Sequence, residues 1–310
     1  MVDCQVICIL GMHRSGTSLI TRLVNLLGVY LGPPEFLLEP KTDNPKGFWE
    51  YLPFVDINDQ LLQQQGGNWY DLPDFSSGWE CKPAFANLKS KAMDLIKRDF
   101  SSRSLWGWKD PRACITTPFW KQVIPRMRYI LCFRNPIDVA RSLESRQLLP
   151  PGRTFQVWLE YVEAALRNTD GEDRIVFSYE DLLNHTEHEL VRLSSFLGAT
   201  ARLDGDKRAQ SARSFVDKEL HHHRTSTAET INNSSLPLGG RAVFVALRHL
   251  IDSLRVSDPS SPELRAAEGD VTLLCHRAVV EGRVARPPWL PGVLHRGIRS
   301  LLAKLSGRTD

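Results

Sequence analysis

The sequence lacks the marks of several large protein classes. Its 310 residues carry a net charge of only +3, which is too small to indicate a nucleic-acid-binding surface or a protein bound to a membrane surface. No apolar run approaches the roughly 18 residues that suggest a transmembrane helix, and no signal-peptide pattern follows Met1. We therefore expect a soluble globular protein with no nucleic-acid partner and no membrane span.

Cysteine-based sites are also missing. The six cysteines include no C-x-x-C pair, and none has a histidine at metal-ligand spacing. Cys4, Cys8 and Cys132 lie in apolar segments with strand character, which predicts reduced and buried thiols. We expect no metal site and a location in the cytoplasm, where thiols stay reduced.

A third absence concerns the segment GMHRSGTS, from Gly11 to Ser18. Phosphate-binding loops of the pattern G-x-x-x-x-G-K-[ST] carry a lysine for the outer phosphates, followed by a hydroxyl that holds Mg²⁺. Gly11, Gly16 and Ser18 keep this pattern, but Thr17 stands in place of the lysine. The loop therefore predicts a phosphate-bearing ligand. It argues against a P-loop nucleotide kinase or hydrolase, which stays the alternative.

Apolar segments rich in β-forming residues alternate along the chain with segments of helical periodicity. Four segments predict strands, at residues 4–10, 104–109, 127–133 and 174–179. Strands separated by helices indicate a parallel sheet, whose ligands bind at the carboxyl ends of the strands. The expected fold class is α/β, a P-loop-type parallel sheet flanked by helices with a mainly helical C-terminal extension.

The last third of the chain has a different pattern. We expect a core domain at residues 1–200 and an extension at residues 201–310 that packs on the same domain. Within the extension, residues 200–240 are polar and predict a loop-rich flap, and two amphipathic helices are expected to follow it.

Basic residues stand at or next to the ends of three predicted strands. Arg14 lies in the loop after the first strand, Lys109 ends the second, and Arg134 follows the third. Because the carboxyl ends of parallel strands share one edge of a sheet, we expect these cations to converge there. Arg134 stands where a nucleotide hydrolase could carry a metal-binding carboxylate, so the pattern favours an anion bound without a metal.

Four pieces of the sequence, taken in order, resemble the sulfotransferase family that uses 3′-phosphoadenosine 5′-phosphosulfate (PAPS). They are GMHRSGTS, WGWKDPR, CFRNPIDVARSLESR and FSYEDLL. The resemblance covers residues 4–200. It is similar to the bacterial carbohydrate-type enzymes, and the pattern of Arg14, Lys109 and Arg134 is similar to that of tyrosylprotein sulfotransferases. The resemblance implies sulfuryl transfer from PAPS to an acceptor hydroxyl without a metal.

The resemblance also implies which residues bind the donor. The loop residues Arg14, Ser15, Gly16, Thr17 and Ser18 would hold the 5′-phosphosulfate. Arg134 and Ser142 would hold the 3′-phosphate, with Arg146 four residues further on as a third contact and Tyr179 near the nucleotide. Arg14 and Lys109 would stabilise the transferring group as catalytic cations. A structural alternative for Lys109 is an ion pair with Asp110 or with a carboxylate on a helix.

The proton acceptor is expected in the segment DNPKGFWE at residues 43–50. Relatives that the sequence resembles use a glutamate from this region as base, which implies Glu50. Asp43 and the histidines His221, His222 and His223 of the expected flap are the next candidates, and a helix-capping role is the structural alternative for Glu50. The acceptor is expected to be a small molecule or glycan with a hydroxyl, recognised by residues 32–82 and 200–240.

Overall fold

The computed structural model describes residues 4–40, 47–73, 75–146, 148–198, 207–216, 225–256 and 262–283. The chain forms two compact units. The first consists of Met1–Phe133 with Gly171–Leu220, and the second of Arg134–Asp170 with His221–Asp310. The boundary at residue 200 that the sequence suggests stays a prediction.

The first unit is built on a parallel sheet of four strands in the order β2-β1-β3-β4. The strands are β1 Gln5–Leu10, β2 Leu105–Lys109, β3 Arg128–Phe133 and β4 Arg174–Ser178. All four predicted strands are confirmed within one residue at each end. Because β1 and β3 are almost wholly buried, their sequences are continuous apolar runs, as expected for a parallel sheet covered on both faces.

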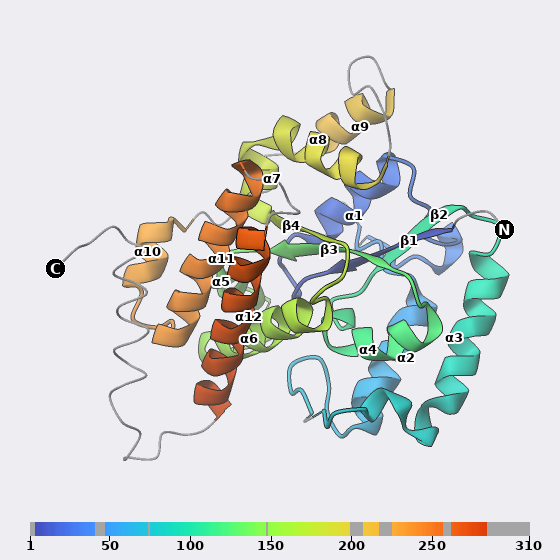
Figure 1. The fold of residues 1–310 in the computed structure, drawn as a ribbon, viewed down its shortest axis with the longest axis horizontal. Helices are drawn as coiled ribbons and strands as arrows, with labels where there is room; N and C mark the ends of the chain where they lie inside the picture. The colour runs from blue at the N-terminus through green and yellow to red at the C-terminus, as the bar shows by residue number, and fades with distance from the viewer. Residues whose placement is uncertain are drawn as a thin grey trace. The chain divides into compact units, whose positions relative to one another are not determined.

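Helices cover both faces of this sheet (Figure 1). On one face lie α1 Thr17–Leu26, α8 Thr186–Phe196 and α9 Lys207–Phe215, and on the other lie α2 Leu52–Gln64, α3 Ala86–Asp99 and α4 Ala113–Val123. The short helix α7 Tyr179–Asn184 follows β4, and three 3₁₀ turns complete the unit: η1 Pro34–Phe36, η2 Trp79–Cys81 and η3 Pro83–Phe85.

The two faces have different cores because successive strand residues point to opposite sides. Ile7 and Ile9 of β1 face an aliphatic core that includes Ile20, Leu23 and Leu193. On the other face, Trp108 of β2 packs with Phe54 of α2 and Trp120 of α4. Trp106, Trp108, Trp120 and Trp158 are all at most 2% exposed, the last of them in the second unit.

The second unit consists of helices among its described residues. They are α5 Pro136–Glu144, α6 Pro151–Asn168, α10 Thr227–Asn232, α11 Leu238–Val256 and α12 Pro262–Arg283. The two expected C-terminal helices are confirmed as α11 and α12, which pack on each other and on α6. Asn135 caps α5, because its side chain accepts a hydrogen bond from Ile137 N at 3.0 Å, with Pro136 in the first turn.

Some helical segments differ from expectation. The sequence EDLLNHTEHELVRLSSFLG, residues 180–198, predicts a single helix, but the structure forms α7 and α8 there, with a break at His185. Helix α4 was not predicted, and Pro118 in its interior weakens the helical signal there. Within residues 200–240, which the sequence suggests are loop, the structure contains α9 and α10. A capping box formed by Ser226 and Glu229 begins α10 and was the signal for it.

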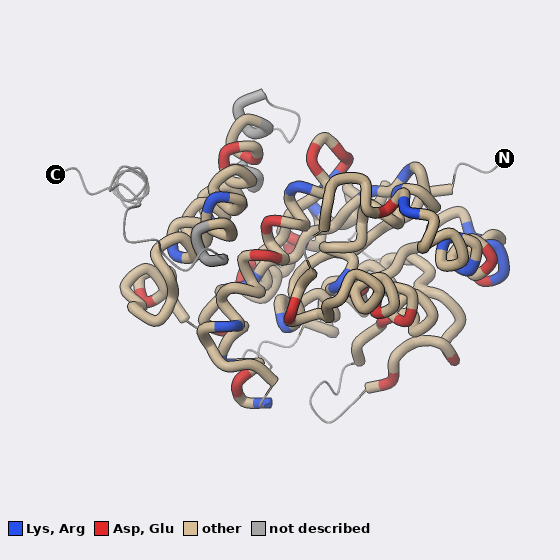
Figure 2. Tube along the Cα trace, turned by 90° about the horizontal axis from the view of Figure 1, so that it is seen from below, with Lys and Arg blue, Asp and Glu red and all other residues tan. Residues whose placement is uncertain are grey.

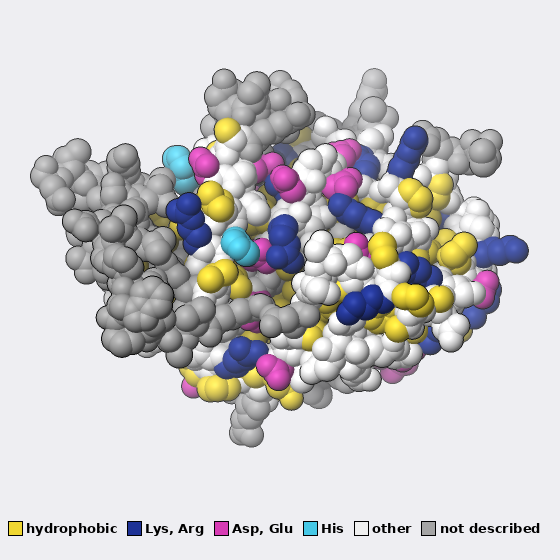
Figure 3. Space-filling view, turned by 60° about the horizontal axis from the view of Figure 1, so that its bottom comes forward, with side chains coloured by type: hydrophobic (Ala, Val, Ile, Leu, Met, Phe, Trp, Pro, Cys, Tyr) yellow, Lys and Arg dark blue, Asp and Glu magenta, His cyan; other side chains and the backbone are white. Residues whose placement is uncertain are grey.

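Charges of both signs are interspersed along the described chain (Figure 2) and on the face of the molecule shown in Figure 3. This distribution agrees with the net charge of +3. Over the described residues, no helix has the length and apolar character needed to cross a membrane.

Candidate functional site

The segment from Gly11 to Ser18 forms a tight loop between β1 and α1. Three residues have positive φ angles, Gly11 at 152°, Arg14 at 69° and Gly16 at 86°, and Gly16 is the N-cap of α1. A Cβ atom on Gly16 would overlap the ring of Tyr179, so the loop needs glycine there both for its backbone angle and for space. Backbone N–H groups at the start of a helix have no acceptor within the helix, and they attract anions.

Two buried thiols hold this loop. Gly11 N donates a hydrogen bond to Cys114 Sγ at 3.1 Å, and Cys132 Sγ donates to Ser15 O at 3.0 Å. Burial raises the pKa of the Cys114 thiol to about 12, so it stays protonated. All six cysteines are free, and the expected burial is confirmed for Cys8 and Cys132. It is wrong for Cys4, which is exposed because β1 begins only at the next residue.

A buried ion pair joins the end of β2 to the segment before α2. Lys109 Nζ lies 2.5 Å from Glu50 Oε1, and the same ammonium donates to Ser18 Oγ at 3.3 Å. Lys109 is 1% exposed and Glu50 is 8% exposed. The structure therefore brings together Ser18 at the end of the loop, the cation Lys109 and the carboxylate Glu50, which the sequence suggested separately. The pairing of Lys109 with Asp110 that was the structural alternative is replaced by pairing with Glu50.

The residues on either side of Glu50 anchor it. Trp49 has a φ of 62°, which is rare for a large side chain, and the guanidinium of Arg22 stacks over its ring at 4.5 Å. Tyr51 is 1% exposed and its hydroxyl donates a hydrogen bond to Asp99. The expected alternative that Glu50 caps a helix is wrong, because α2 has Tyr51 as its N-cap and no side-chain cap.

The loop and β2 also gather positive charge around His13. Burial lowers the pKa of His13 well below its usual value, and the charges of Arg112, Lys109 and Arg14 lower it further. These three cations therefore lie close enough to His13 to act on it electrostatically. The imidazole of His13 packs on Trp69, with ring centroids 4.4 Å apart. This ring contact gives His13 a packing role in the loop.

The sequence analysis missed a polar network beside Lys109. The fully buried carboxylate of Asp110 accepts hydrogen bonds from Asn58 Nδ2 at 2.8 Å and from Arg112 NH1 at 2.9 Å. Asn58 Oδ1 in turn accepts from Thr116 and Trp120. Arg112 also pairs with Asp59 at 2.6 Å. The charged segment KDPR, residues 109–112, could have indicated this network. The residues that bind Asp110 and Arg112 lie on α2, however, and Asn58 of α2 in turn binds residues of α4.

Three of the predicted donor residues belong to the second unit and are described within it. Arg134 is 8% exposed, and its carbonyl accepts a hydrogen bond from Trp158 Nε1 at 3.2 Å. Ser142 is 7% exposed on α5. Arg146 was expected on the same helical face as Ser142, but α5 ends at Glu144, and Arg146 lies in the turn that follows.

The remaining candidates have mixed outcomes. Tyr179 begins α7 in the first unit and lies against Gly16, next to the loop, as described above. Asp43, His221, His222 and His223 lie outside the described residues. Within the described part of the chain, no group of three or more His, Cys, Asp and Glu side chains is arranged to hold a metal ion.

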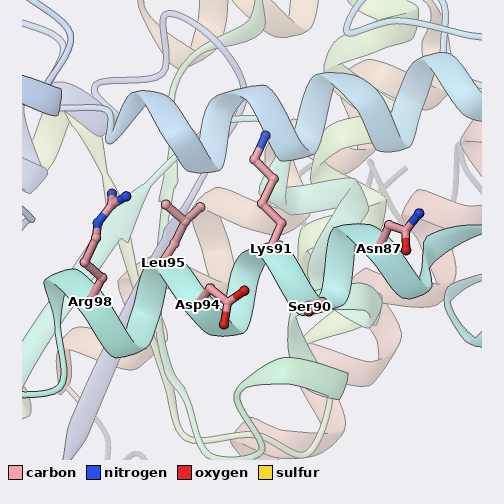
Figure 4. Close-up of a pocket in the computed structure, with 6 residues that line it drawn as sticks. All are labelled: Asn87, Ser90, Lys91, Asp94, Leu95 and Arg98. Atoms are coloured by element: carbon pink, nitrogen blue, oxygen red, sulfur yellow. The ribbon is translucent and has the colours of Figure 1, made fainter.

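A separate hollow of about 670 Å³ lies along one face of α3. Figure 4 shows its lining side chains, which all come from this helix: Asn87, Ser90, Lys91, Asp94, Leu95 and Arg98. Lys91 pairs with Asp56 of α2 at 2.5 Å. None of the residues assigned to the site lines this hollow.

Comparison with known proteins identifies the family. No curated protein sequence matches the chain. Among solved structures, it is similar to the sulfotransferase domain of the olefin synthase from Synechococcus PCC 7002, at 15% identity and a TM-score of 0.39, over 93% of this chain and 98% of that one. It is also similar to the sulfotransferase STF1 of Mycobacterium tuberculosis H37Rv, at 14% identity and a TM-score of 0.38, over 73% of each chain.

The sequence match covers the site described above. A model of the sulfotransferase family matches residues 6–202, which contain the phosphate loop, Glu50, Lys109 and all of the parallel sheet except Gln5 at the start of β1. The chain therefore belongs to the sulfotransferase family.

Proposed function

We propose that the chain transfers a sulfuryl group from PAPS to a hydroxyl of a carbohydrate, or of a glycosylated or other small metabolite. One observation carries the proposal: at the phosphate loop, the buried ammonium of Lys109 contacts both Ser18 and the buried carboxylate of Glu50. A cation for a transferring anion and a candidate base for an acceptor hydroxyl thus lie side by side in a member of the sulfotransferase family.

The loop fits a phosphosulfate group. Ser15, Gly16, Thr17 and Ser18 stand at the start of α1, where backbone N–H groups and the helix dipole favour an anion. Thr17 cannot supply the charge that a lysine has in other phosphate loops. Lys109 brings an ammonium to the same loop from the neighbouring strand β2, at 3.3 Å from Ser18 Oγ. Lys109 therefore supplies at the loop the positive charge that the lysine of the usual motif would supply.

In the proposed reaction, each charged residue has one role. PAPS supplies the sulfuryl group, whose S–O bond to the 5′-phosphate breaks as a bond to the acceptor oxygen forms. Glu50 takes the proton of the acceptor hydroxyl on a carboxylate oxygen. Arg14 and Lys109 stabilise negative charge on the sulfuryl oxygens and on the leaving phosphate, as positioned cations do in phosphoryl transfer. The products are the sulfated acceptor and 3′-phosphoadenosine 5′-phosphate.

We assign the 3′-phosphate of the donor to Arg134 and Ser142, with Arg146 as a further contact and Tyr179 beside the nucleotide. Arg134 and Ser142 are both mostly buried, as expected for groups that meet a desolvated phosphate. The start of α5 is held by Asn135, whose side chain caps the helix and donates to Thr230 Oγ1 at 2.7 Å. This capping supports a fixed position for Ser142 within the second unit.

The alternative, a nucleotide kinase or hydrolase, needs a carboxylate for Mg²⁺ near the loop. Asp110 directly follows β2 and is the nearest acidic residue in sequence to Lys109. Its two carboxylate oxygens already accept hydrogen bonds from Asn58 and Arg112. This arrangement favours a structural role for Asp110 and supports sulfuryl transfer over the alternative.

The test is an assay with labelled donors and a panel of alcohols and glycosides. We expect sulfate transfer from PAPS that persists in excess chelator, and no phosphoryl transfer from ATP. Absence of transfer from PAPS to every acceptor, together with Mg²⁺-dependent ATP turnover, would overturn the proposal.

Donor affinity tests the assignment of the 3′-phosphate. Arg134→Ala should lose the preference for PAPS over adenosine 5′-phosphosulfate, a change of about 10- to 100-fold for a charge-assisted hydrogen bond worth roughly 1.5–3 kcal/mol. Arg141→Ala is the matched control, because Arg141 is an exposed arginine on α5, the helix that begins just after Arg134, and it donates to Thr225 Oγ1. Equal losses for both donors in Arg134→Ala would show that Arg134 is structural.

A further inference from the structure

A short turn after α2 presents two aromatic side chains in a fixed geometry. Asn68 Oδ1 accepts hydrogen bonds from Tyr70 N and Asp71 N, both at 2.9 Å, and Asn68 N donates to Asp71 O at 2.8 Å. Gly67 N donates to Leu62 O at 3.0 Å, which ties the turn to the end of α2. A Cβ atom on Gly67 would overlap Asp71 O, so the turn is closed too tightly for any other residue at that position.

This turn lies against the phosphate loop. The ring of Trp69 is 4.4 Å from that of His13, between centroids, and His13 directly precedes Arg14 in the loop. His13 is also within the electrostatic reach of Lys109. Trp69 therefore contacts the loop that carries Arg14, one of the residues assigned to sulfuryl transfer.

The aromatic surface continues outward from Trp69. Tyr70 meets Trp69 edge to face, with centroids 5.2 Å apart and ring planes at 84°. Trp69 is half-buried, whereas Tyr70 is 42% exposed. The next residue, Asp71, has an exposed side chain. Three consecutive residues on a rigid turn thus present an indole, a phenol and a carboxylate, from the loop outward.

This combination matches the chemistry of a sugar ring. A pyranose has an apolar face of C–H groups that can lie on an aromatic ring, and a rim of hydroxyls that can donate to a carboxylate.

We propose that Trp69 and Tyr70 bind a pyranose ring of the acceptor beside the phosphate loop, with Asp71 accepting hydrogen bonds from its hydroxyls. The inference rests on the proposed function and specifies its acceptor as a sugar-bearing one. It makes Trp69 a specificity-determining residue of the same site.

The test measures sugar binding without turnover. Saturation-transfer NMR is recorded on the full chain with bound 3′-phosphoadenosine 5′-phosphate, and with methyl glycosides of glucose, galactose, mannose and N-acetylglucosamine as probes. At least one glycoside should receive saturation at its ring C–H protons. Trp69→Ala should reduce that signal at least fivefold, Trp69→Phe should retain most of it, and Tyr70→Ala should reduce it two- to threefold.

Controls separate this inference from the proposed function. Met93→Ala removes an exposed large side chain from α3 and should leave the signal unchanged. Binding of 3′-phosphoadenosine 5′-phosphate should stay within twofold of wild type in all four variants. A signal from the acyclic polyol sorbitol equal to that of the glycosides, binding of phenol in place of every glycoside, or an unchanged signal in Trp69→Ala and Tyr70→Ala would each overturn the inference. Failure of the nucleotide to bind wild type would instead contradict the proposed donor.

Discussion

At the scale of single residues, the pair of Lys109 and Glu50 is the feature that most needs an explanation. Burying two charges costs several kcal/mol per ion, and their mutual attraction repays that cost only with good geometry, so a buried ion pair is weak evidence for a stabilising role. Lys109 and Glu50 nevertheless lie 2.5 Å apart and mostly out of solvent. In the proposed reaction, these two charges act on the donor and on the acceptor hydroxyl.

The first prediction at this scale concerns Glu50→Gln. Glutamine keeps an oxygen for Lys109 but cannot take a proton from the acceptor, so turnover should fall by about 10² to 10⁴. The affinity for 3′-phosphoadenosine 5′-phosphate should hold or increase, because Lys109 then has no carboxylate to neutralise its charge. Calorimetric affinity and turnover, measured on the same preparation, check this expectation.

A matched control for Glu50→Gln is Glu189→Gln. Glu189 is 1% exposed and pairs with Arg192 at 2.5 Å on α8, so the control also removes one charge from a buried pair. It should lower the unfolding midpoint and leave turnover unchanged. If Glu50→Gln behaves like this control, with turnover within a few fold of wild type, then Glu50 is not the base.

At the scale of elements, the junction between the phosphate loop and α1 combines two constraints on one residue. Gly16 needs a positive φ, and it also lies against the ring of Tyr179 at the start of α7. The loop geometry therefore depends on how β1, α1 and α7 meet. Non-glycine residues also adopt positive φ angles in this unit, at Arg14 and Trp49. Such strained residues cluster at functional sites, where the surrounding structure holds them in place.

The prediction for this element compares two glycine substitutions. Gly171→Ala changes a residue with a φ of 71° and open space around it, so it should cost only the backbone strain, about 1–2 kcal/mol. Gly16→Ala adds the overlap with Tyr179 and should cost about 2–5 kcal/mol in all. Denaturant unfolding measures both values. Gly16→Ala should also weaken binding of 3′-phosphoadenosine 5′-phosphate, whereas Gly171→Ala should not.

Equal losses of stability in the two glycine variants would contradict this account of the junction. They would mean that the Tyr179 ring moves aside without cost. Unchanged nucleotide affinity in Gly16→Ala would separate the loop from donor binding.

At the scale of the whole molecule, the chain enters each compact unit more than once. The second unit takes α5 and α6 from the middle of the chain and α10, α11 and α12 from its end. Helix α6 is buried along most of its length and packs on α11 and α12, and His276 of α12 lies 3.3 Å from Glu163 of α6. Helices α11 and α12, which cover α6 together with α5, therefore lie more than 60 residues after α6 in the sequence.

This connectivity gives a prediction for a fragment of residues 1–200. The fragment keeps α6 but loses α11 and α12, so the apolar face of α6 loses its partners. We expect it to aggregate or to unfold without a cooperative transition, measured by circular dichroism melting and gel filtration. A fragment of residues 1–283, which keeps α12, is the control and should melt cooperatively. A stable, cooperative fragment of residues 1–200 would instead support the domain boundary that the sequence suggests.

The sequence by itself determined the parts of the protein that depend on local patterns. Continuous apolar runs located all four strands, because a parallel strand covered on both faces needs no polar position. The spacing of Gly11, Gly16 and Ser18 identified a phosphate loop, and Asn135 with Pro136 marked the start of α5. These signals are short-range, since each depends on a few consecutive residues and on backbone chemistry alone.

Only the tertiary structure decided which groups meet. Lys109 and Glu50 are 59 residues apart, and Cys114 reaches Gly11 across 103 residues. The contact of Trp69 with His13 likewise joins two different loops. The spacing of residues in the sequence does not predict such contacts. They depend on the order of the strands in the sheet and on which face of each helix packs on the sheet. The same packing holds Trp49 at a positive φ and sets the partners of Asp110, against what local preference alone would favour.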